Sequence, residues 1–140
     1  MASRNVELAK AGYAALAETY RTKDMAPLRA LLEENVDPGF VLRGEGAFTE
    51  GEWHGPGGLL SFVTNQMEAM ESMWIRAEEF LEVDEHTVVV PVTFGGRARH
   101  TEIEVELSPT HVYSSRDGKF TMLRIFRTRE EALAAVRAQV

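Results

Sequence analysis

The first quarter of the chain carries apolar residues at helical spacing. Between positions 6 and 20 they recur at steps of mostly three and four residues, as Val6, Ala9, Tyr13, Leu16, Ala17 and Tyr20. This spacing predicts a helix with one apolar stripe that runs to about Arg21. Asp24 is a good N-cap and Pro27 is tolerated in a first turn, so a second, shorter helix is expected to follow. Its apolar positions are Met25, Leu28, Leu31 and Leu32, and Asp37-Pro38-Gly39 is expected to end it.

A short hairpin and a third helix are predicted next. Residues 40–43 are a strand candidate, and residues 44–51 are expected to form a loop that returns to a second short strand at Trp53. Gly55-Pro56 then opens a helix. The apolar stripe of this helix is Leu59, Leu60, Val63, Met67 and Met70, with Phe62 beside it.

From Trp74 onward the apolar period changes to two, which is typical of β-strands. The strands are predicted near 74–83, 87–95, 97–107, 110–116 and 119–127, with turns at Asp84-Glu85, Gly95-Gly96 and Asp117-Gly118. Short connections of this kind join antiparallel neighbours. The second half of the chain is therefore predicted to be an antiparallel meander.

Two segments of the meander carry further expectations. In residues 102–107 acidic and aliphatic residues alternate, so the acids are expected to face solvent while Ile103, Val105 and Leu107 face the core. Pro91 cannot donate to a strand ladder, which favours an edge position or a bulge that would bend the sheet.

The chain is predicted to end in another helix. Thr128 and Glu131 have the spacing of a capping box, and the apolar residues Ala132, Leu133 and Val136 follow. The order of elements predicts an α+β fold in which three leading helices lie on one face of a strongly curved, mostly antiparallel sheet, with a short C-terminal helix. Residues 1–140 are expected to form a single domain.

Composition and charge exclude several classes of function. The chain has 15 basic and 22 acidic residues, and its net charge of -7 argues against nucleic acid or an anionic membrane as a partner. It has no cysteine, so disulfides and thiolate chemistry are excluded and a cytoplasmic location is permitted. The charged residues near the N-terminus do not match a secretory signal, and the longest uncharged run is too short to span a membrane. The four histidines are widely spaced, so neither a metal site nor a cofactor is predicted.

Four stretches of the sequence resemble a known superfamily. They are residues 24–32 (DMAPLRALL), 53–58 (WHGPGG), 111–119 (HVYSSRDGK) and 129–133 (REEAL). Together with the order of elements, they resemble the nuclear-transport-factor-two-like superfamily, and within it the SnoaL-like group related to polyketide cyclases and ketosteroid isomerases. The resemblance covers the chain from about Asn5 to Val136 and implies a conical α+β fold. It implies no single activity, because the superfamily hosts isomerases, cyclases, hydrolases, dehydratases and members that only bind.

The resemblance also identifies positions that carry catalytic groups in relatives. The tyrosine, base and protonated aspartate of a ketosteroid isomerase correspond here to Leu16, Arg43 and Thr110, which cannot supply a base and an oxyanion hole. A cyclase of the SnoaL kind would have a histidine that matches His111 and an aspartate where Ile125 stands. Both activities are therefore disfavoured as they are known in the family.

His111 is the leading candidate for chemistry, since imidazole titrates near neutrality and can act as a general base. Arg43 or Tyr113 would then be the donor that polarises the substrate. The alternation that starts at Ile103 places His111 and Tyr113 on the inner side of the sheet, whereas a bulge at Ser108-Pro109 would place Thr110 and Val112 there instead.

The main functional prediction is a protein that holds or acts on a small apolar or oxygenated molecule inside the cone, in a cavity of roughly a few hundred Å³. Its predicted wall consists of Leu16, Tyr20, Trp53, Phe62, Met70, Trp74, Phe94 and Ile125. The alternative is a non-catalytic homodimeric module that pairs through the open face of the sheet. Apolar residues on both faces of the last strands, among them Phe120, Met122 and Phe126, favour that alternative.

Overall fold

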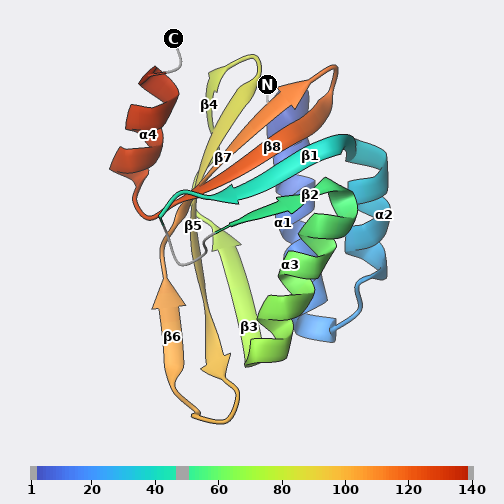
Figure 1. Cartoon of the computed structure of the whole chain (residues 1–140), viewed down its shortest axis with the longest axis vertical. Coiled ribbons are helices and arrows are strands. Elements are labelled where there is room, and N and C mark those ends of the chain that lie inside the picture. The colour runs from blue at the N-terminus through green and yellow to red at the C-terminus, as the bar shows by residue number, and fades with distance from the viewer. Residues whose placement is uncertain (1–2, 47–50, 139–140) are drawn as a thin grey trace.

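The computed structural model describes residues 3–46 and 51–138 of the chain. Within these ranges the chain forms four helices and eight strands (Figure 1). The helices are α1 (Arg4–Thr22), α2 (Ala26–Asn35), α3 (Gly55–Ala69) and α4 (Arg129–Ala138). The strands are β1 (Val36–Gly44), β2 (Glu52–His54), β3 (Met70–Ala77), β4 (Leu81–Asp84), β5 (Thr87–Ala98), β6 (Glu104–Leu107), β7 (Thr110–Arg116) and β8 (Lys119–Phe126). The predicted α+β class, with three leading helices and a short C-terminal helix, is confirmed.

The ends of α1 and α4 have local causes in the sequence. The Ser3 side chain accepts a hydrogen bond from the Val6 backbone N–H at 3.2 Å, and Lys23 ends α1 in the left-handed conformation. At the start of α4 the Thr128 hydroxyl accepts from the Glu131 N–H at 3.1 Å, as predicted for a cap. These side chains satisfy backbone groups that a helix terminus leaves without an intrahelical partner.

The boundary between α2 and β1 differs from the prediction. Asp37-Pro38-Gly39 does not separate helix from strand, because β1 already begins at Val36. The Asp37 carboxylate accepts from the Gly39 N–H at 2.7 Å, and the register of β1 shifts between Val36 and Val41. The motif thus makes an irregularity inside a strand whose first residue is buried. The predicted loop at 44–51 lies partly outside the described residues, but the short strand at Trp53 is confirmed as β2.

The strands form one sheet in the order β2-β1-β8-β7-β5-β3, and β4 and β6 also pair with β5. The β1–β8 pair is parallel and the other pairs are antiparallel. The predicted strand at 74–83 is two strands, β3 and β4, which lie against successive parts of β5. The sequence had placed Met70 in the apolar stripe of α3. In the structure β3 begins at Met70, so this residue belongs to the sheet.

Gly95 and Gly96 lie inside β5, so the turn predicted there is wrong. Gly95 pairs with Trp74 on one side and Glu106 on the other. A Cβ atom on Gly95 would lie 2.6 Å from the Val105 carbonyl oxygen, and one on Gly96 would lie 2.0 Å from the Ser72 carbonyl oxygen. The two glycines are therefore needed for the close approach of β3 and β6 to β5.

Pro91 and Ile103 also differ from expectation. Pro91 pairs with Thr110 of β7 and lies in the interior of the sheet, at the position where β5 changes neighbours from β7 to β6. The Pro91 carbonyl accepts from the Glu78 N–H at 2.8 Å, so the Pro91 nitrogen faces the other side of β5, where the pairing with β4 ends and that with β3 begins. The missing N–H therefore falls at the gap between those two strands. Ile103 precedes β6 and is 61% exposed, since the hairpin formed by the end of β5 and β6 extends away from the core (Figure 1).

The three leading helices lie on one face of the sheet, as predicted, and α4, whose face the sequence had left open, lies on the other. Helices α1 to α3 pack on the inner face, and α4 packs on the outer face of β5, β7 and β8 (Figure 1). Alternate residues of β5 show this division, because Val88 and Val90 join the core beneath α1 whereas Val89 joins Ala132 and Val136 of α4. Phe120 and Phe126, predicted for a dimer face, are buried on the inner and outer side respectively, and only Met122 is half-buried on the outer face.

Candidate functional site

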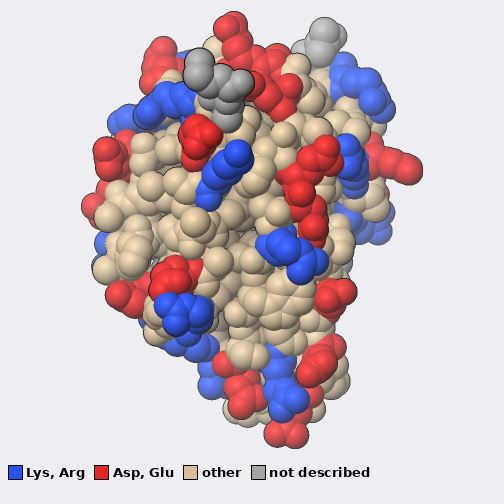
Figure 2. All heavy atoms as spheres, turned by 180° about the vertical axis from the view of Figure 1, so that it is seen from behind, with Lys and Arg blue, Asp and Glu red and all other residues tan. Residues whose placement is uncertain are grey.

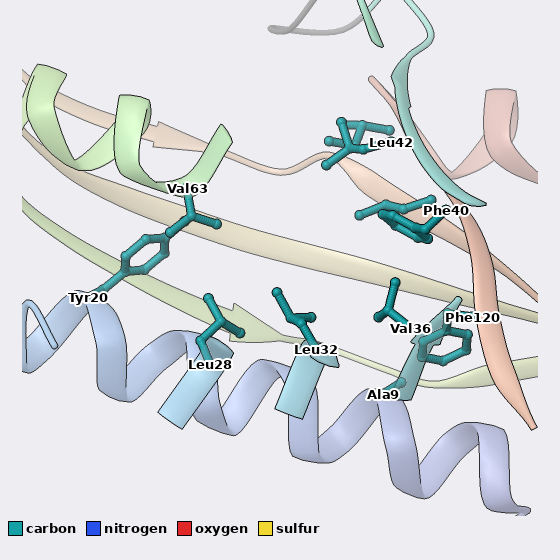
Figure 3. Packing of buried hydrophobic residues seen from close by; sticks show 11 residues of the cluster. Ala9, Tyr20, Leu28, Leu32, Val36, Phe40, Leu42, Val63 and Phe120 are labelled. Atoms are coloured by element: carbon teal, nitrogen blue, oxygen red, sulfur yellow. The ribbon is translucent and has the colours of Figure 1, made fainter. Parts of the chain in front are cut away.

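The inner face of the sheet and helices α1 to α3 enclose a cavity of about 110 Å³. Figure 3 shows the buried side chains around it, with Leu28 and Leu32 of α2 facing Val63 of α3 and Phe40 of β1. The cavity is smaller than the few hundred Å³ expected from the sequence. Its wall is mostly aliphatic and aromatic, and none of the described residues that line it is Asp, Glu, Lys or Arg.

A chain of three polar side chains forms one part of the cavity wall. The Tyr113 hydroxyl donates to the Tyr13 hydroxyl at 2.8 Å, and the Tyr13 hydroxyl lies 2.6 Å from Nδ1 of His111. Tyr13 comes from α1, while His111 and Tyr113 come from the same face of β7. The Tyr13 ring also stacks on the His111 ring, with centroids 5.9 Å apart. Helix α1 therefore holds the imidazole by both a hydrogen bond and ring contact.

Burial determines the protonation states in this chain. It lowers the pKa of His111 from 6.5 to about 4, so the imidazole is neutral at pH 7. Burial likewise raises the pKa values of Tyr13 and Tyr113 above the usual tyrosine value, and the Tyr13 pKa is raised further by the charge of Tyr113 and the hydrogen bond between them. All three groups are uncharged at neutral pH and can serve as hydrogen-bond partners in an apolar surrounding.

A second polar contact lies elsewhere on the wall. The Tyr20 hydroxyl donates to Oε1 of Gln66 at 3.1 Å, which joins α1 to α3 across the cavity. Burial, followed by the charge of Tyr113, raises the pKa of Tyr20 above its ordinary range. Gln66 thus satisfies a phenol that would otherwise be buried without a partner.

Seven of the residues predicted for the site line the cavity. They are Leu16, Tyr20, Phe62, Phe94, His111, Tyr113 and Ile125. The inward alternative for His111 holds, because β7 begins at Thr110 and pairs in regular register with β5 as far as Ser114. The bulge considered at Ser108-Pro109 therefore does not turn His111 outward.

Four other predicted residues do not line the cavity, namely Trp53, Met70, Trp74 and Arg43. Trp53 packs behind the wall, edge-on to Phe62 with ring centroids 4.9 Å apart. Met70 is half-buried at the start of β3. Trp74 is 40% exposed on the outer face, where the Arg76 guanidinium lies 5.5 Å from its ring centroid. Trp74 was predicted on the inner face, but the inward residues of β3 are Met73 and Ile75, which pack against the core.

Arg43 lies on the outer face in a charge cluster with Glu45 and Arg124. The Glu45 carboxylate is bound by Arg43 and, at 3.0 Å, by Nε of Arg124. Partial burial opposes ionisation of Glu45, but the hydrogen bonds and charges of Arg124 and Arg43 outweigh it and hold its pKa below the ordinary value. This cluster spans β1 and β8 and is a structural feature of the outer face, so Arg43 cannot polarise a molecule in the cavity.

Sequence reasoning missed Tyr13 and Gln66 as site residues. Tyr13 was assigned to the same helical stripe as Leu16 and Tyr20, but only those two were predicted for the cavity wall. Gln66 precedes Met67 in α3 and gave no signal in the apolar pattern.

The described part of the chain contains neither a cluster of metal-binding side chains nor a helix that could span a membrane. No three His, Asp or Glu side chains in residues 3–46 and 51–138 gather as they would to hold a metal ion. None of the helices in the same ranges has both the length and the apolarity needed to cross a bilayer.

Neither protein-family models nor curated protein sequences give a match to this chain. Solved structures do. TerC, co-crystallised with polyporic acid, is 20% identical, with 96% of this chain and 99% of that chain covered and a TM-score of 0.69. An NTF2-like protein of unknown function from Burkholderia pseudomallei K96243 is 18% identical over 95% and 97% of the two chains, with a TM-score of 0.71.

A third similar structure is a protein from Jannaschia sp. CCS1, described as a SnoaL-like polyketide cyclase. It is 18% identical, with 94% of this chain and 90% of that chain covered, and its TM-score is 0.70. These likenesses extend over nearly the whole chain, as the four sequence stretches had implied. The fold of this chain is therefore the NTF2-like fold that SnoaL-like proteins also have.

Proposed function

We propose that this protein binds a small, uncharged, largely apolar molecule in the cavity between α1 to α3 and the sheet. The observation that carries this proposal is the cavity itself, about 110 Å³ of space with a mostly apolar wall that also carries the Tyr113–Tyr13–His111 chain and the Tyr20–Gln66 pair. Sites for small molecules typically combine an apolar lining with a few polar groups that fix orientation.

The absence of charge on the described wall selects against ionic ligands. Transfer of an ion into an apolar site without a countercharge is strongly unfavourable. At neutral pH His111, Tyr13 and Tyr113 are all uncharged, so none of them compensates a carboxylate or an ammonium group. The expected ligand is neutral.

The volume limits the ligand to about one ring unless the wall moves. An engineered protein cavity of about 150 Å³, lined by Leu, Ile and Phe, takes up benzene. The present cavity is of that order. TerC, which shares the fold, was co-crystallised with polyporic acid, and this supports a ligand-binding role for this chain.

Toluene is a suitable probe for the binding test, and Gly12 offers a way to fill the cavity. Gly12 lines the cavity from α1, and a Cβ atom there would meet no heavy atom within 4 Å. Saturating toluene is expected to raise the Tm of the wild type, because a ligand that binds only the folded state stabilises it. Gly12→Leu should remove this rise.

Ala14→Leu is the matched control, since Ala14 is exposed on the same helix and does not line the cavity. Its response to toluene should equal that of the wild type. An unchanged Tm of the wild type across a toluene titration, together with unchanged NMR shifts of Leu16 and Ile125, would refute the proposed function.

Catalysis and dimerisation remain predictions beside this proposal. Proton transfer or hydrolysis would rest on His111 and Tyr113, the two predicted catalytic residues at the cavity wall. A homodimer through the outer face of the sheet would cover the half-buried Met122 and the Arg43–Glu45–Arg124 cluster. Sedimentation at micromolar concentration tests the dimer, and a monomeric species there would count against it.

A further inference from the structure

Trp74 of β3 lies on the outer face of the sheet, outside the area that α4 covers. Strands β3, β5 and β6 lie side by side there, whereas α4 packs on β5, β7 and β8 further along the sheet (Figure 1). Trp74 is 40% exposed. The cavity is on the opposite face, so this region is separate from the site of the proposed function.

The register of the three strands places polar side chains around Gly95. Gly95 pairs with Trp74 on β3 and with Glu106 on β6, so these three residues point to the same face. Residues two positions away along each strand also point to this face. Together with Glu106, they form a polar frame that consists of Ser72, Arg76, Thr93, Arg97, Glu104 and Ser108.

The missing side chain of Gly95 lets the indole occupy the centre of this frame. A Cβ atom on Gly95 would lie 2.8 Å from Cζ2 and 3.0 Å from Cε2 of Trp74, so the six-membered ring of the indole lies against the glycine backbone. The Cζ atom of Arg76 is 5.5 Å from the ring centroid. The sheet thus presents one fixed aromatic ring with polar groups around it.

The polar frame can make further hydrogen bonds. It contains two arginines, two glutamates and three hydroxyl groups, so its formal charge is zero. Arg97 lies 3.6 Å from Glu104, and the hydroxyls of Thr93 and Ser108 are 3.5 Å apart. A guanidinium has more donors, and a carboxylate more acceptor sites, than these contacts use. Free donors and free acceptors therefore surround the indole.

We propose that the outer face at Trp74 binds a saccharide, whose neutral pyranose ring stacks on the indole while its hydroxyls bond to the polar frame. The face is hollowed there, and Trp74, Arg97, Glu104 and Glu106 are among the residues that line the hollow. A pyranose with equatorial hydroxyls has apolar C–H faces and a polar rim, which matches an aromatic ring among mixed donors and acceptors. The zero charge of the frame favours a neutral ligand over an ion.

A second copy of this chain is the alternative occupant of this face. The core of a protein interface is typically apolar and depleted of charged residues. Here the indole is the apolar centre, and the arginines and glutamates of the frame lie beside it on the same face. This composition favours a small polyhydroxylated ligand over a protein partner.

NMR of ¹⁵N-labelled protein tests the site directly. The chain has two tryptophans, Trp53 and Trp74, so two indole N–H signals report on the two regions separately. Cellotriose is expected to shift the Trp74 signal in a saturable way and to leave Trp53, which packs behind the cavity wall, unchanged. Sorbitol has hydroxyls but no ring face and should cause no saturable shift. A Trp74 signal that does not move up to the solubility limit of cellotriose would refute the inference.

Two variants test the ring and the frame, with affinity measured from the backbone amide signals of Gly95 and Arg97. Trp74→Ala should weaken cellotriose binding about tenfold. Glu106→Val keeps the ring but removes an acceptor and should weaken binding about threefold, so it decides the case if Trp74→Ala does not fold. Ile103→Ala is the matched control, because it removes an exposed apolar side chain of the same hairpin that lies outside the frame. Its affinity should equal that of the wild type.

Two further results would overturn the inference. Equal affinities of the wild type, Trp74→Ala and Glu106→Val would mean that cellotriose binds elsewhere on the protein. A wild-type dimer in sedimentation that Trp74→Ala converts to a monomer, without cellotriose binding, would make this face an interface between copies. Both results leave the toluene test of the cavity unaffected, so the two proposals are refuted separately.

Discussion

At the scale of single residues, the cavity depends on a histidine that burial keeps neutral. The His111 pKa is lowered to about 4, whereas a histidine in the unfolded chain titrates at 6.5. Between these values the unfolded chain binds a proton that the folded protein does not. Stability must therefore fall as the pH is lowered through this window.

The first prediction follows from this difference. Between pH 7 and pH 5 the free energy of unfolding is expected to drop by about 2 kcal/mol on account of His111 alone. Urea denaturation at pH 7, 6 and 5 measures the drop. His111→Phe should flatten the pH dependence by that amount, while His100→Asn, at an exposed position with a φ of 76°, should leave it unchanged. Equal slopes in the wild type and His111→Phe would show that the imidazole is not kept neutral.

Asn5 provides a second prediction at this scale. Its buried amide donates to the Glu85 carbonyl oxygen and to the Ser115 hydroxyl, both at 2.9 Å, and so fastens α1 to the β4–β5 turn and to β7. Asn5→Ala leaves buried acceptors without this donor and should lower the free energy of unfolding by about 1–3 kcal/mol in chemical denaturation. Asn65→Ala, at an exposed position of α3, should change it by less than about 0.5 kcal/mol.

At the scale of elements, two glycines have opposite roles. Gly12 lies inside α1 with open space around its Cβ position, whereas Gly96 lies where β3 approaches β5 most closely. Alanine limits the unfolded chain more than glycine does and favours a helix when there is room for its methyl group. The same methyl group at Gly96 would collide with backbone that cannot move independently.

The corresponding prediction is a pair of alanine variants. Gly12→Ala should raise the free energy of unfolding by about 0.5–1 kcal/mol. Gly96→Ala should lower it by at least about 1–3 kcal/mol, because the strands must separate to admit the Cβ atom. Thermal unfolding of both variants beside the wild type tests this contrast, and a stabilised Gly96→Ala protein would contradict the packing described for β5.

The sequence predicted the helices and strands better than it predicted which of them pack or pair with one another. The helices, the strand at Thr110–Arg116 and the turn at Asp117-Gly118 follow from spacing and turn chemistry, which are local. Gly95-Gly96 looked like a turn because glycine serves both tight turns and close strand approach, and only the position of β3 and β6 decides between them. Only part of the cavity wall was predicted, because some of its residues depend on local spacing and others on tertiary packing. Leu16 and Tyr20 follow from a helical stripe, whereas the chain from Tyr13 to His111 depends on how α1 lies against β7.

At the scale of the whole molecule, the sheet is buried on both faces by helices of different chain segments. The charged residues are spread over the remaining surface, and Figure 2 shows Lys and Arg beside Asp and Glu on the side that lies behind the view of Figure 1. Several of these charges are paired, for instance Arg129 with Glu79 at 2.9 Å, which ties α4 to the segment between β3 and β4. The cavity and α4 lie on opposite faces of the sheet.

Helix α4 is predicted to be required for the stability of the whole domain, including the cavity on the other face of the sheet. Replacing Ala132, which is fully buried, with Glu would place a charge between the helix and Val89. The Tm should fall strongly and a dye that binds exposed apolar surface should report the change, since an unpaired buried charge is among the most damaging substitutions. Ala135→Glu, half-buried on the same helix, is the milder comparison. A variant at Ala132 with the wild-type Tm would show that α4 is dispensable.

The position of Pro91 in β5 has a consequence for the unfolded chain. Val88, Val89, Val90 and Val92 are all buried because the strand is covered on both sides, so the same run is a strongly self-associating segment whenever the protein is open. Pro91 interrupts that run where β5 passes from β4 to β3, and its nitrogen faces the gap between these two strands. Pro91 is therefore expected to act as a gatekeeper against fibril-like stacking during refolding. Pro91→Val is expected to fold when dilute, yet its soluble yield should fall steeply as the protein concentration rises.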